Sequence, residues 1–76
     1  MPMNEKDRAI LAAEIGGLIK QAREGVGMSA ATLAKRLDVS RQYIARIESG
    51  DATPNVRRLV EIAEILEVET AKILPD

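Results

Sequence analysis

The chain has 76 residues, no cysteine, no histidine and a formal net charge of −1 at pH 7. This length suffices for one domain, which we expect to span residues 1–76, and the missing residue types exclude disulfides, thiolate metal sites and the commonest general base. No apolar run approaches the ~20 residues that a membrane span needs and the first residues are polar, so we expect a cytoplasmic protein with no membrane contact, metal or cofactor.

The first predicted element is an amphipathic helix over residues 4–24, with Asn4 as its N-cap. Gly16 and Gly17 lie inside it and each costs ~1 kcal/mol relative to alanine, so we expect a bend or a close helix crossing there. Residues 1–14 are expected to form a helical N-terminal extension. The apolar stripe that predicts the helix consists of Leu11, Ile15, Leu18, Ile19 and Ala22.

The next predicted unit, residues 29–49, is a pair of short helices joined by a very short turn. A serine precedes each helix, and serine is a strong N-cap. So short a turn makes the two helices cross steeply instead of lying antiparallel. Asp38 in the turn is expected to be left-handed, a conformation that aspartate tolerates. The expected helices and caps are Ala30–Leu37 after Ser29 and Arg41–Ser49 after Ser40.

Two further helices complete the prediction. Thr53 followed by Pro54 indicates an N-cap with proline at the first helical position, and this fourth helix is expected to run to Leu66. A last short helix is expected over about Glu69 to Leu74, after which Pro75 prevents its continuation. The predicted fold is therefore all-α with five helices.

Charge is distributed unevenly along the chain. Residues 29–58 carry six basic and three acidic side chains, whereas residues 59–76 carry one basic and five acidic side chains. The local field, and not the net charge, steers a phosphate backbone. The positive segment, which contains the two short helices, is therefore the part expected to face a polyanion.

Within the helix predicted over residues 41–49, polar and apolar side chains separate into two faces. At 100° per residue, the hydrogen-bonding side chains fall within a sector of about 140°, and the isoleucines point the other way. Arginine can bind guanine and glutamine can bind adenine through paired hydrogen bonds, and a small residue between them permits close approach. The alternative is an ordinary solvated helix face. The outward set is Arg41, Gln42, Ala45, Arg46 and Ser49.

Several landmarks coincide between Gly27 and Leu66. They are Leu33-Ala34, the turn Leu37-Asp38-Val39-Ser40, Ile44, Ile47-Glu48 before Gly50, then Pro54 and Leu59. Together they resemble the phage repressor and Cro type of helix-turn-helix domain, the XRE family. The resemblance implies a five-helix, lambda-repressor-like domain that binds double-stranded DNA and regulates transcription, most simply as a repressor.

The resemblance also implies roles for individual residues. The positions that match the major-groove face are Ser40, Arg41, Gln42, Ala45 and Arg46. The positions that match phosphate contacts are Ser29, Thr32, Tyr43, Ser49 and Asn55. Arg23 and Glu48 match a buried salt bridge that ties the first helix to the third, a structural role.

Three departures from the family pattern accompany the match. Ala30 replaces the glutamine usually found at the start of the second helix, which removes one familiar contact. Asp38 and Glu67 stand where the family prefers glycine, at a cost in stability. Asp51 places an acid beside an expected contact with the phosphate backbone of DNA, so we expect main-chain N–H groups of the protein to bind phosphate there.

A dimer follows from the small surface that one recognition helix buries. We expect a homodimer that reads an inverted repeat. Its two copies are expected to meet through the acidic C-terminal segment, residues 67–76, and the residue before it. The alternative is that these apolar side chains only close the core of the monomer. A second candidate surface is the N-terminal extension, with Ile10 and Leu11. The predicted interface residues are Leu66, Val68, Ala71, Ile73 and Leu74.

Two neighbouring roles stay open. An antitoxin also binds DNA but chiefly occupies a toxin protein, and here only the first 14 residues are free to wrap such a partner. A controller protein of a restriction-modification system has this size and can activate as well as repress. An enzyme is not expected, since no nucleophile, base and orienting group converge in the sequence. Arg57 and Arg58 are expected to form a surface pair with Glu61, with contact to DNA as the alternative.

Overall fold

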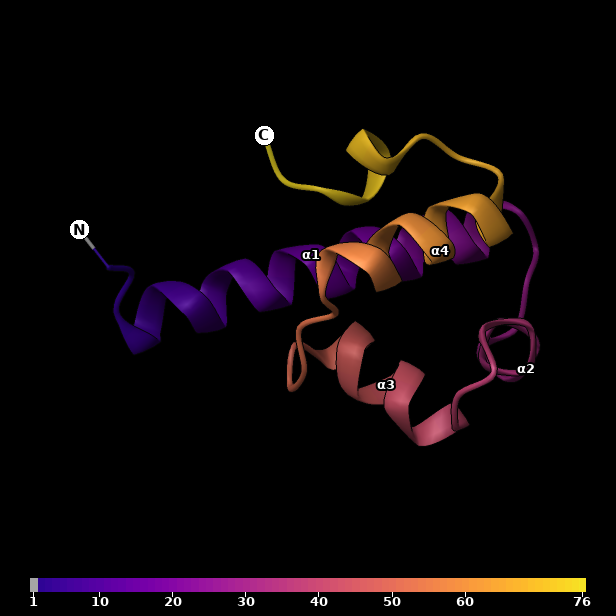
Figure 1. Ribbon diagram of the computed structural model, residues 1–76, viewed down its shortest axis with the longest axis horizontal. Helices are drawn as coiled ribbons and strands as arrows, with labels where there is room; N and C mark the ends of the chain where they lie inside the picture. Colours follow the sequence, from indigo (N-terminus) through magenta and orange to yellow (C-terminus); the bar gives the residue numbers. More distant parts are fainter. Residues whose placement is uncertain (1) are drawn as a thin grey trace.

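The computed structural model describes residues 2–76 as four α-helices followed by one short 3-10 helix (Figure 1). Within these residues there is no β-strand, and none of the helices has the length and apolar character that crossing a bilayer requires. Residue 1 of the predicted N-terminal extension lies outside the described range. The elements are α1 (Glu5–Gly25), α2 (Ala30–Leu37), α3 (Arg41–Ser49), α4 (Val56–Leu66) and η1 (Thr70–Ile73).

Three of the predicted N-caps are confirmed, and each closes the first turn of its helix. In every case the side-chain oxygen of the cap accepts a hydrogen bond from the backbone N–H three residues later, which satisfies one of the unpaired donors at a helix start. These three bonds are local, which is why the sequence pattern could predict them. The bonds run from Asp7 N to Asn4 at 2.8 Å, from Thr32 N to Ser29 at 3.0 Å and from Tyr43 N to Ser40 at 3.0 Å.

The predicted start of α4 is wrong by two residues. The N-cap is Asn55, whose Oδ1 accepts a hydrogen bond from the Arg58 N–H at 2.8 Å, and not Thr53. Pro54 lies before the helix and is buried. Asparagine is at least as good an N-cap as threonine, and burial of the proline ring holds the preceding segment outside the helix.

The predicted last short helix forms only as the one-turn 3-10 helix η1, so the chain has four α-helices where five helices were expected. No side chain caps the start of η1 at Glu69, and its turn is closed by a 2.9 Å bond from Lys72 N to Glu69 O. Glu67, which ends α4, is left-handed with a φ of 58°. The residues between Glu67 and Pro75 include the connection from α4 and lack a side-chain N-cap, and only a single 3-10 turn forms there.

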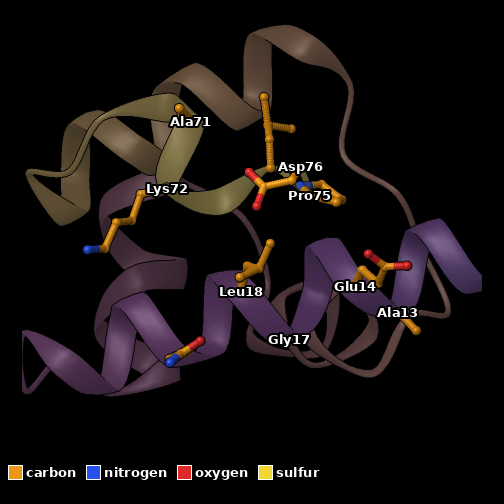
Figure 2. Close-up of a pocket in the computed structure, with 10 residues that line it drawn as sticks. Ala13, Glu14, Gly17, Leu18, Ala71, Lys72, Pro75 and Asp76 are labelled. Atoms are coloured by element: carbon orange, nitrogen blue, oxygen red, sulfur yellow. The ribbon is translucent and has the colours of Figure 1, made fainter.

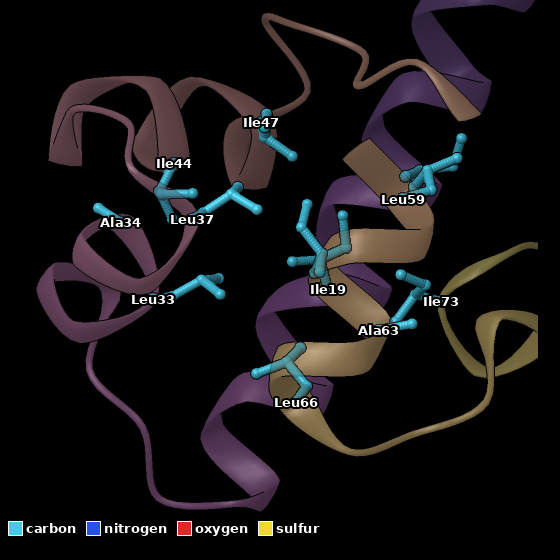
Figure 3. Close-up of a cluster of buried hydrophobic side chains, with 12 residues drawn as sticks. Ile19, Leu33, Ala34, Leu37, Ile44, Ile47, Leu59, Ala63, Leu66 and Ile73 are labelled. Carbon is cyan, nitrogen blue, oxygen red and sulfur yellow. The ribbon is translucent and has the colours of Figure 1, made fainter. Parts of the chain in front are cut away.

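The core is aliphatic and lies between the α2-α3 pair on one side and α1 and α4 on the other (Figure 3). Ile19 of α1 sits at its centre and is fully buried. Burial of each such side chain contributes about 1.5–3 kcal/mol. The largest side chains that are less than 2% exposed are Ile19, Leu33, Ile44, Ile47, Ile62, Leu66 and Ile73.

Two residues predicted for a dimer interface belong instead to this core. Leu66 is 1% exposed and Ile73 is 0% exposed, because η1 folds back against α4 and α1. A protomer that buries them has no way to offer them to a partner. The other three predicted residues lie at the surface: Val68 is half-buried, and Ala71 and Leu74 are exposed.

The α1 and α3 helices cross closely at Gly16, which is one of the two outcomes expected from the paired glycines. A Cβ on Gly16 would overlap the carbonyl oxygen of Ile47 and lie 2.9 Å from that of Glu48. A Cβ on Gly17 would meet nothing within 4 Å. The close crossing therefore depends on Gly16, and it sets how near α3 lies to α1.

Candidate nucleic-acid interface

The turn between α2 and α3 occupies three residues and is held by its own backbone. Asp38 is left-handed with a φ of 60°, and its N–H donates to Lys35 O at 3.2 Å. The next N–H, from Val39, donates to Ala34 O at 3.0 Å, and the Val39 side chain packs against the core. These contacts set the angle between the helices before any ligand is present.

This turn presents the polar side of α3 to solvent. Ile44 and Ile47 are each 1% exposed and anchor the helix from behind. Within residues 2–76, the arginines of the outward face take part in no ion pair. Their guanidinium groups therefore keep all their donors available to a ligand. The exposed outward residues are Arg41, Gln42, Ala45 and Arg46, with Ser40 and Ser49 at the two ends of the helix.

The predicted phosphate-contact residues differ in the donors that they retain. Ser29 donates its hydroxyl to Thr32 Oγ1 at 2.9 Å, and Ser49 donates its hydroxyl to Arg46 O at 3.1 Å, so both hydrogens are used within the chain. The side-chain hydroxyls of Thr32 and Ser40 only accept in the bonds they make. Thr32 and Ser40 are thus better placed to donate to an external oxygen than Ser29 or Ser49.

Asn55 and Tyr43 keep donors as well. Asn55 uses its Oδ1 to cap α4, which leaves its amide NH₂ free of any hydrogen bond in the described part of the chain. Tyr43 is half-buried beside the core, with a phenol that forms no hydrogen bond among residues 2–76. The amide of Asn55 and the phenol of Tyr43 are therefore both available for the phosphate contacts that the family resemblance predicts.

The loop after α3 does not provide the free main-chain donors expected near Asp51. The carbonyl of Arg46 accepts from Asp51 N at 2.8 Å and from Ala52 N at 3.1 Å. Both N–H groups are therefore used to bind the loop to α3. Gly50, left-handed with a φ of 87°, makes this reversal possible.

Arg23 and Glu48 form a bidentate ion pair between α1 and α3. Arg23 Nε lies 2.7 Å from Glu48 Oε2, and Nη2 lies 2.9 Å from Oε1. The third nitrogen, Nη1, donates to Met28 O at 2.7 Å, which also ties in the loop before α2. The hydrogen bond to Glu48 raises the pKa of the Arg23 guanidinium above its usual range, although burial acts the other way. This pair supports α3 from the side opposite its exposed face.

Arg58 makes a contact that no sequence pattern indicated. Its Nη1 lies 3.4 Å from Glu61 Oε1, the expected surface pair, and donates to Leu37 O, also at 3.4 Å. Leu37 is the last residue of α2, so Arg58 links α4 to the end of α2 beside the turn. The two partners are separated by 21 residues, and only the folded chain brings them together.

The basic residues of α2 and α3 are separated from the acidic C-terminal segment. Lys35 and Arg36 on α2 are exposed, like Arg41 and Arg46 on α3. Figure 1 shows α2 and α3 on one side of α1 and the segment after α4 on the other. The side that carries α2 and α3 thus combines positive charge with paired hydrogen-bond donors.

Comparisons with known proteins agree on the type of domain. A family model described as helix-turn-helix matches residues 19–73. An HTH-type transcriptional regulatory protein of Methanococcoides burtonii is 37% identical over 57 residues, which are 75% of this chain and 18% of that protein. The chain thus spans less than a fifth of this curated relative.

Solved structures share the fold across different protein sizes. The restriction-modification controller protein C.AhdI from Aeromonas hydrophila superposes with a TM-score of 0.78 at 22% identity, over 83% of this chain and 96% of that one. A helix-turn-helix family transcriptional regulator from Vibrio cholerae gives 0.79 at 26% identity, over 87% of this chain and 37% of that one. Hydroxypropylphosphonic acid epoxidase from S. wedmorenis superposes with a TM-score of 0.80 at 27% identity, over 86% of this chain and 35% of that one. Since the fold also forms part of an enzyme, function must be argued from the site.

Proposed function

The chain belongs to the helix-turn-helix family of DNA-binding transcriptional regulators, and we propose that it binds one DNA sequence specifically and represses transcription as a homodimer. Members of this family bind DNA, so the partner class follows from membership. The choice of one sequence, the dimer and the sign of regulation are the proposal. Because a transcriptional regulator must reach the DNA that it binds, we also propose a cytoplasmic location.

The exposed face of α3 carries this proposal. Arg41 and Gln42 lie in its first turn, where a helix enters the major groove most deeply, and both side chains are exposed. Arginine recognises guanine O6 and N7, and glutamine recognises adenine N6 and N7. Ala45, exposed one turn later, leaves room for close approach to the base edges. We therefore assign base contacts to Arg41 and Gln42, and further groove contacts to Arg46.

Phosphate contacts are assigned to the groups that retain donors around α3. Thr32, Ser40 and the amide of Asn55 each have a hydrogen to donate, and Tyr43 offers its phenol. Ser29 and Ser49 remain in the predicted set but would first have to release the bonds they make within the chain. Such contacts position the protein on the duplex and carry no sequence information directly.

A homodimer would place two α3 helices about 34 Å apart, one turn of B-DNA, on an inverted repeat. Of the predicted interface residues, the surface positions Val68, Ala71 and Leu74 support this part of the proposal. They lie in the acidic segment, on the side of α1 away from α2 and α3.

Selection of bound sequences from random duplex DNA tests the proposal. We expect the wild-type chain to enrich one inverted-repeat motif, and Arg41→Ala and Gln42→Ala each to relax one position in each half-site. Lys20→Ala, at an exposed position of α1 outside the proposed DNA contacts, is the matched control and should enrich the unchanged motif. Absence of any enriched motif with the wild-type chain would contradict sequence-specific binding.

A controller role is the second candidate, because this chain covers nearly the whole of C.AhdI. That likeness concerns size and fold. A reporter gene downstream of the selected motif separates the two roles, since a repressor lowers expression at every promoter-overlapping position and a controller raises it at some.

A further inference from the structure

The first two turns of α1 extend beyond the rest of the molecule (Figure 1). We call residues 4–11 the α1 arm. All of residues 2–10 are exposed, and the buried face of α1 begins only at Ala12. Ile10, on the arm, is 50% exposed. The family model begins at residue 19, so the arm lies outside the part that the family shares.

The arm is a well-formed helix although, among residues 2–76, only Leu11 at its end packs against the core and residues 4–10 are exposed. Asn4 caps its start, and the guanidinium of Arg8 donates to Met3 O from Nε at 3.2 Å and from Nη2 at 3.0 Å. Glu5 and Asp7 lie in the first turn, where negative charge favours the helix dipole. A partner would therefore meet a preformed helix, at little cost in ordering.

A groove runs along α1 beside the segment after α4 (Figure 2). Its α1 wall includes Glu14, Gly17 and Leu18, and its other wall includes Ala71 and Lys72. The cavity volume is about 620 Å³. An adjoining hollow of about 340 Å³ continues it toward the end of α1, where it is lined by Ala22, Val26 and Val68. The two hollows share Leu18, Gln21 and Lys72 in their linings, and we call them together the α1 groove.

The arm and the α1 groove lie on the same side of the same helix. Glu14 and Gly17, which line the groove, follow Ile10 by four and seven residues, the spacing of one helix face. A twofold axis across the middle of α1 would place two α1 helices antiparallel. Each arm would then lie against the partner's groove, which is the self-complementary arrangement that a twofold dimer needs.

The charges of the arm and the groove are complementary. Lys6 and Asp7 lie on either side of Ile10 on the exposed surface of the arm. The groove carries Lys72 from the C-terminal segment, and the acids Glu14 and Asp76. Lys72 lines the part of the groove beside Leu18 and Ala22, where the partner's arm would lie, so Asp7 can meet it there. Ile10 of the same arm then enters the apolar centre formed by Leu18, Ala71 and Val68.

We infer that two copies of this chain dimerise by exchanging their α1 arms, each arm lying antiparallel in the α1 groove of the other copy. This inference rests on the proposed homodimer and names its surface. It extends the predicted interface from Val68, Ala71 and Leu74 to the flank of α1. It also joins the two candidate surfaces of the sequence analysis into one, since the arm of one copy meets the C-terminal segment of the other.

Intermolecular disulfides test the arrangement directly, because the natural chain has no cysteine. One preparation carries Ile10→Cys, a second carries Lys72→Cys, and the two are mixed under mild oxidation. We expect a disulfide-linked dimer that contains one copy of each. Ala9→Cys mixed with Lys72→Cys is the matched control, because Ala9 is exposed on the same arm but points about 100° away from Ile10. Equal yields from both mixtures would overturn the inference.

Sedimentation equilibrium provides the second measurement. Ile10→Glu should weaken self-association at least tenfold, and Ala9→Glu, which adds the same charge next to it, should change it less than threefold. Both positions are exposed, so the helical circular dichroism of each variant should match the natural chain. A dimer that Ile10→Glu leaves intact would overturn the arm exchange while leaving the proposed homodimer standing. A natural chain that is monomeric and also binds its selected DNA site as a monomer would overturn both, and DNA binding by α3 would still stand.

Discussion

Among single residues, burial separates the arginines that hold the fold from those that face solvent. Arg23 is 8% exposed and gives three of its nitrogens to partners within the chain. Arg41 and Arg46 are exposed and, within residues 2–76, form no ion pair. Substitutions of the first kind should therefore change stability, and substitutions of the second kind should change DNA binding.

Glu48→Ala should lower the free energy of unfolding by about 3 kcal/mol, because it leaves the buried Arg23 cation without its partner. Urea denaturation followed by circular dichroism measures the loss. Glu61→Ala is the control: its pair with Arg58 spans 3.4 Å at a side chain that is 36% exposed, so the loss should stay below about 1 kcal/mol. Similar losses in both variants would contradict a structural role for the buried pair.

The raised pKa of Arg23 adds a pH dependence to this pair. A base whose pKa is higher in the folded state contributes stability at every pH below its unfolded pKa, and loses it as pH rises through the folded value. The contribution of this cation is therefore complete at neutral pH and falls only under strongly alkaline conditions.

Arg41→Ala should weaken binding to the selected site by about fivefold to 150-fold, the ~1–3 kcal/mol of a paired contact to guanine, and should weaken binding to random duplex much less. Lys35→Ala, on the exposed face of α2, should weaken both by a similar factor because a phosphate contact is blind to sequence. Fluorescence anisotropy measures, for the selected duplex and for the random duplex, the ratio of each variant's dissociation constant to that of the natural chain. An equal loss on both duplexes for Arg41→Ala would rule out direct base contact.

Among the elements, α1 sets the position of α3. The last turn of α3 lies against the backbone of α1, with Gly16 below the carbonyls of Ile47 and Glu48. Gly50, which ends α3, lies over Ala13 in the same way: a Cβ there would come within 2.9 Å of the Ala13 Cα. The position of α3, and with it the direction of its exposed face, thus depends on Gly16 and Gly50 at two points of the crossing with α1.

Gly16→Ala should lower stability by several kcal/mol, because the new methyl group overlaps backbone that cannot rotate away. Gly17→Ala, one residue later in the same helix and with no atom of its own chain within 4 Å of the new methyl group, should raise the stability of the single protomer by up to ~1 kcal/mol through helix propensity. Thermal unfolding of the two variants makes the comparison. A stabilised Gly16→Ala variant would mean that α1 and α3 do not cross as closely as described.

In the whole molecule, the separation of charge matters more than the net value of −1. Four exposed cations, Lys35, Arg36, Arg41 and Arg46, lie on α2 and α3, while the acidic residues after α4 lie across α1 from them. The same separation would keep the acidic segments of a dimer away from the phosphate backbone. A protein of slightly acidic composition is thereby suited to a polyanionic partner.

A dimer should show a clear salt dependence of binding, because Lys35 and Arg36 of each copy are exposed and available to phosphates, while Arg41 and Arg46 are assigned to the groove. At about 0.9 counterions released per neutralised phosphate, these four cations predict a slope of about −3.6 for log K against log salt concentration. Titrations of the selected duplex between about 50 and 200 mM salt, a range over which phosphate contacts dominate the change in affinity, measure the slope. A slope of about −1.8 would indicate one bound copy, and a slope near zero would contradict phosphate contact.

The features predicted correctly from the sequence are those made within a few residues of the chain. The bounds of α2 and α3 and the caps Asn4, Ser29 and Ser40 are of this kind, as is the left-handed Asp38. Each depends on a hydrogen bond or a backbone preference that spans three or four positions. The helix-turn-helix family was identified from the same local pattern, and the family match confirms it.

The features that were missed depend on packing between distant parts of the chain. The fold back of η1 buries Ile73 and Leu66 and removes them from any interface, and burial of Pro54 moves the start of α4 to Val56. The bond from Arg58 to the end of α2 and the groove beside α1 arise in the same way. A hydrophobic pattern tells which side chains seek burial, but it does not tell which segment covers them, because that choice is made by the free energy of the whole packed chain.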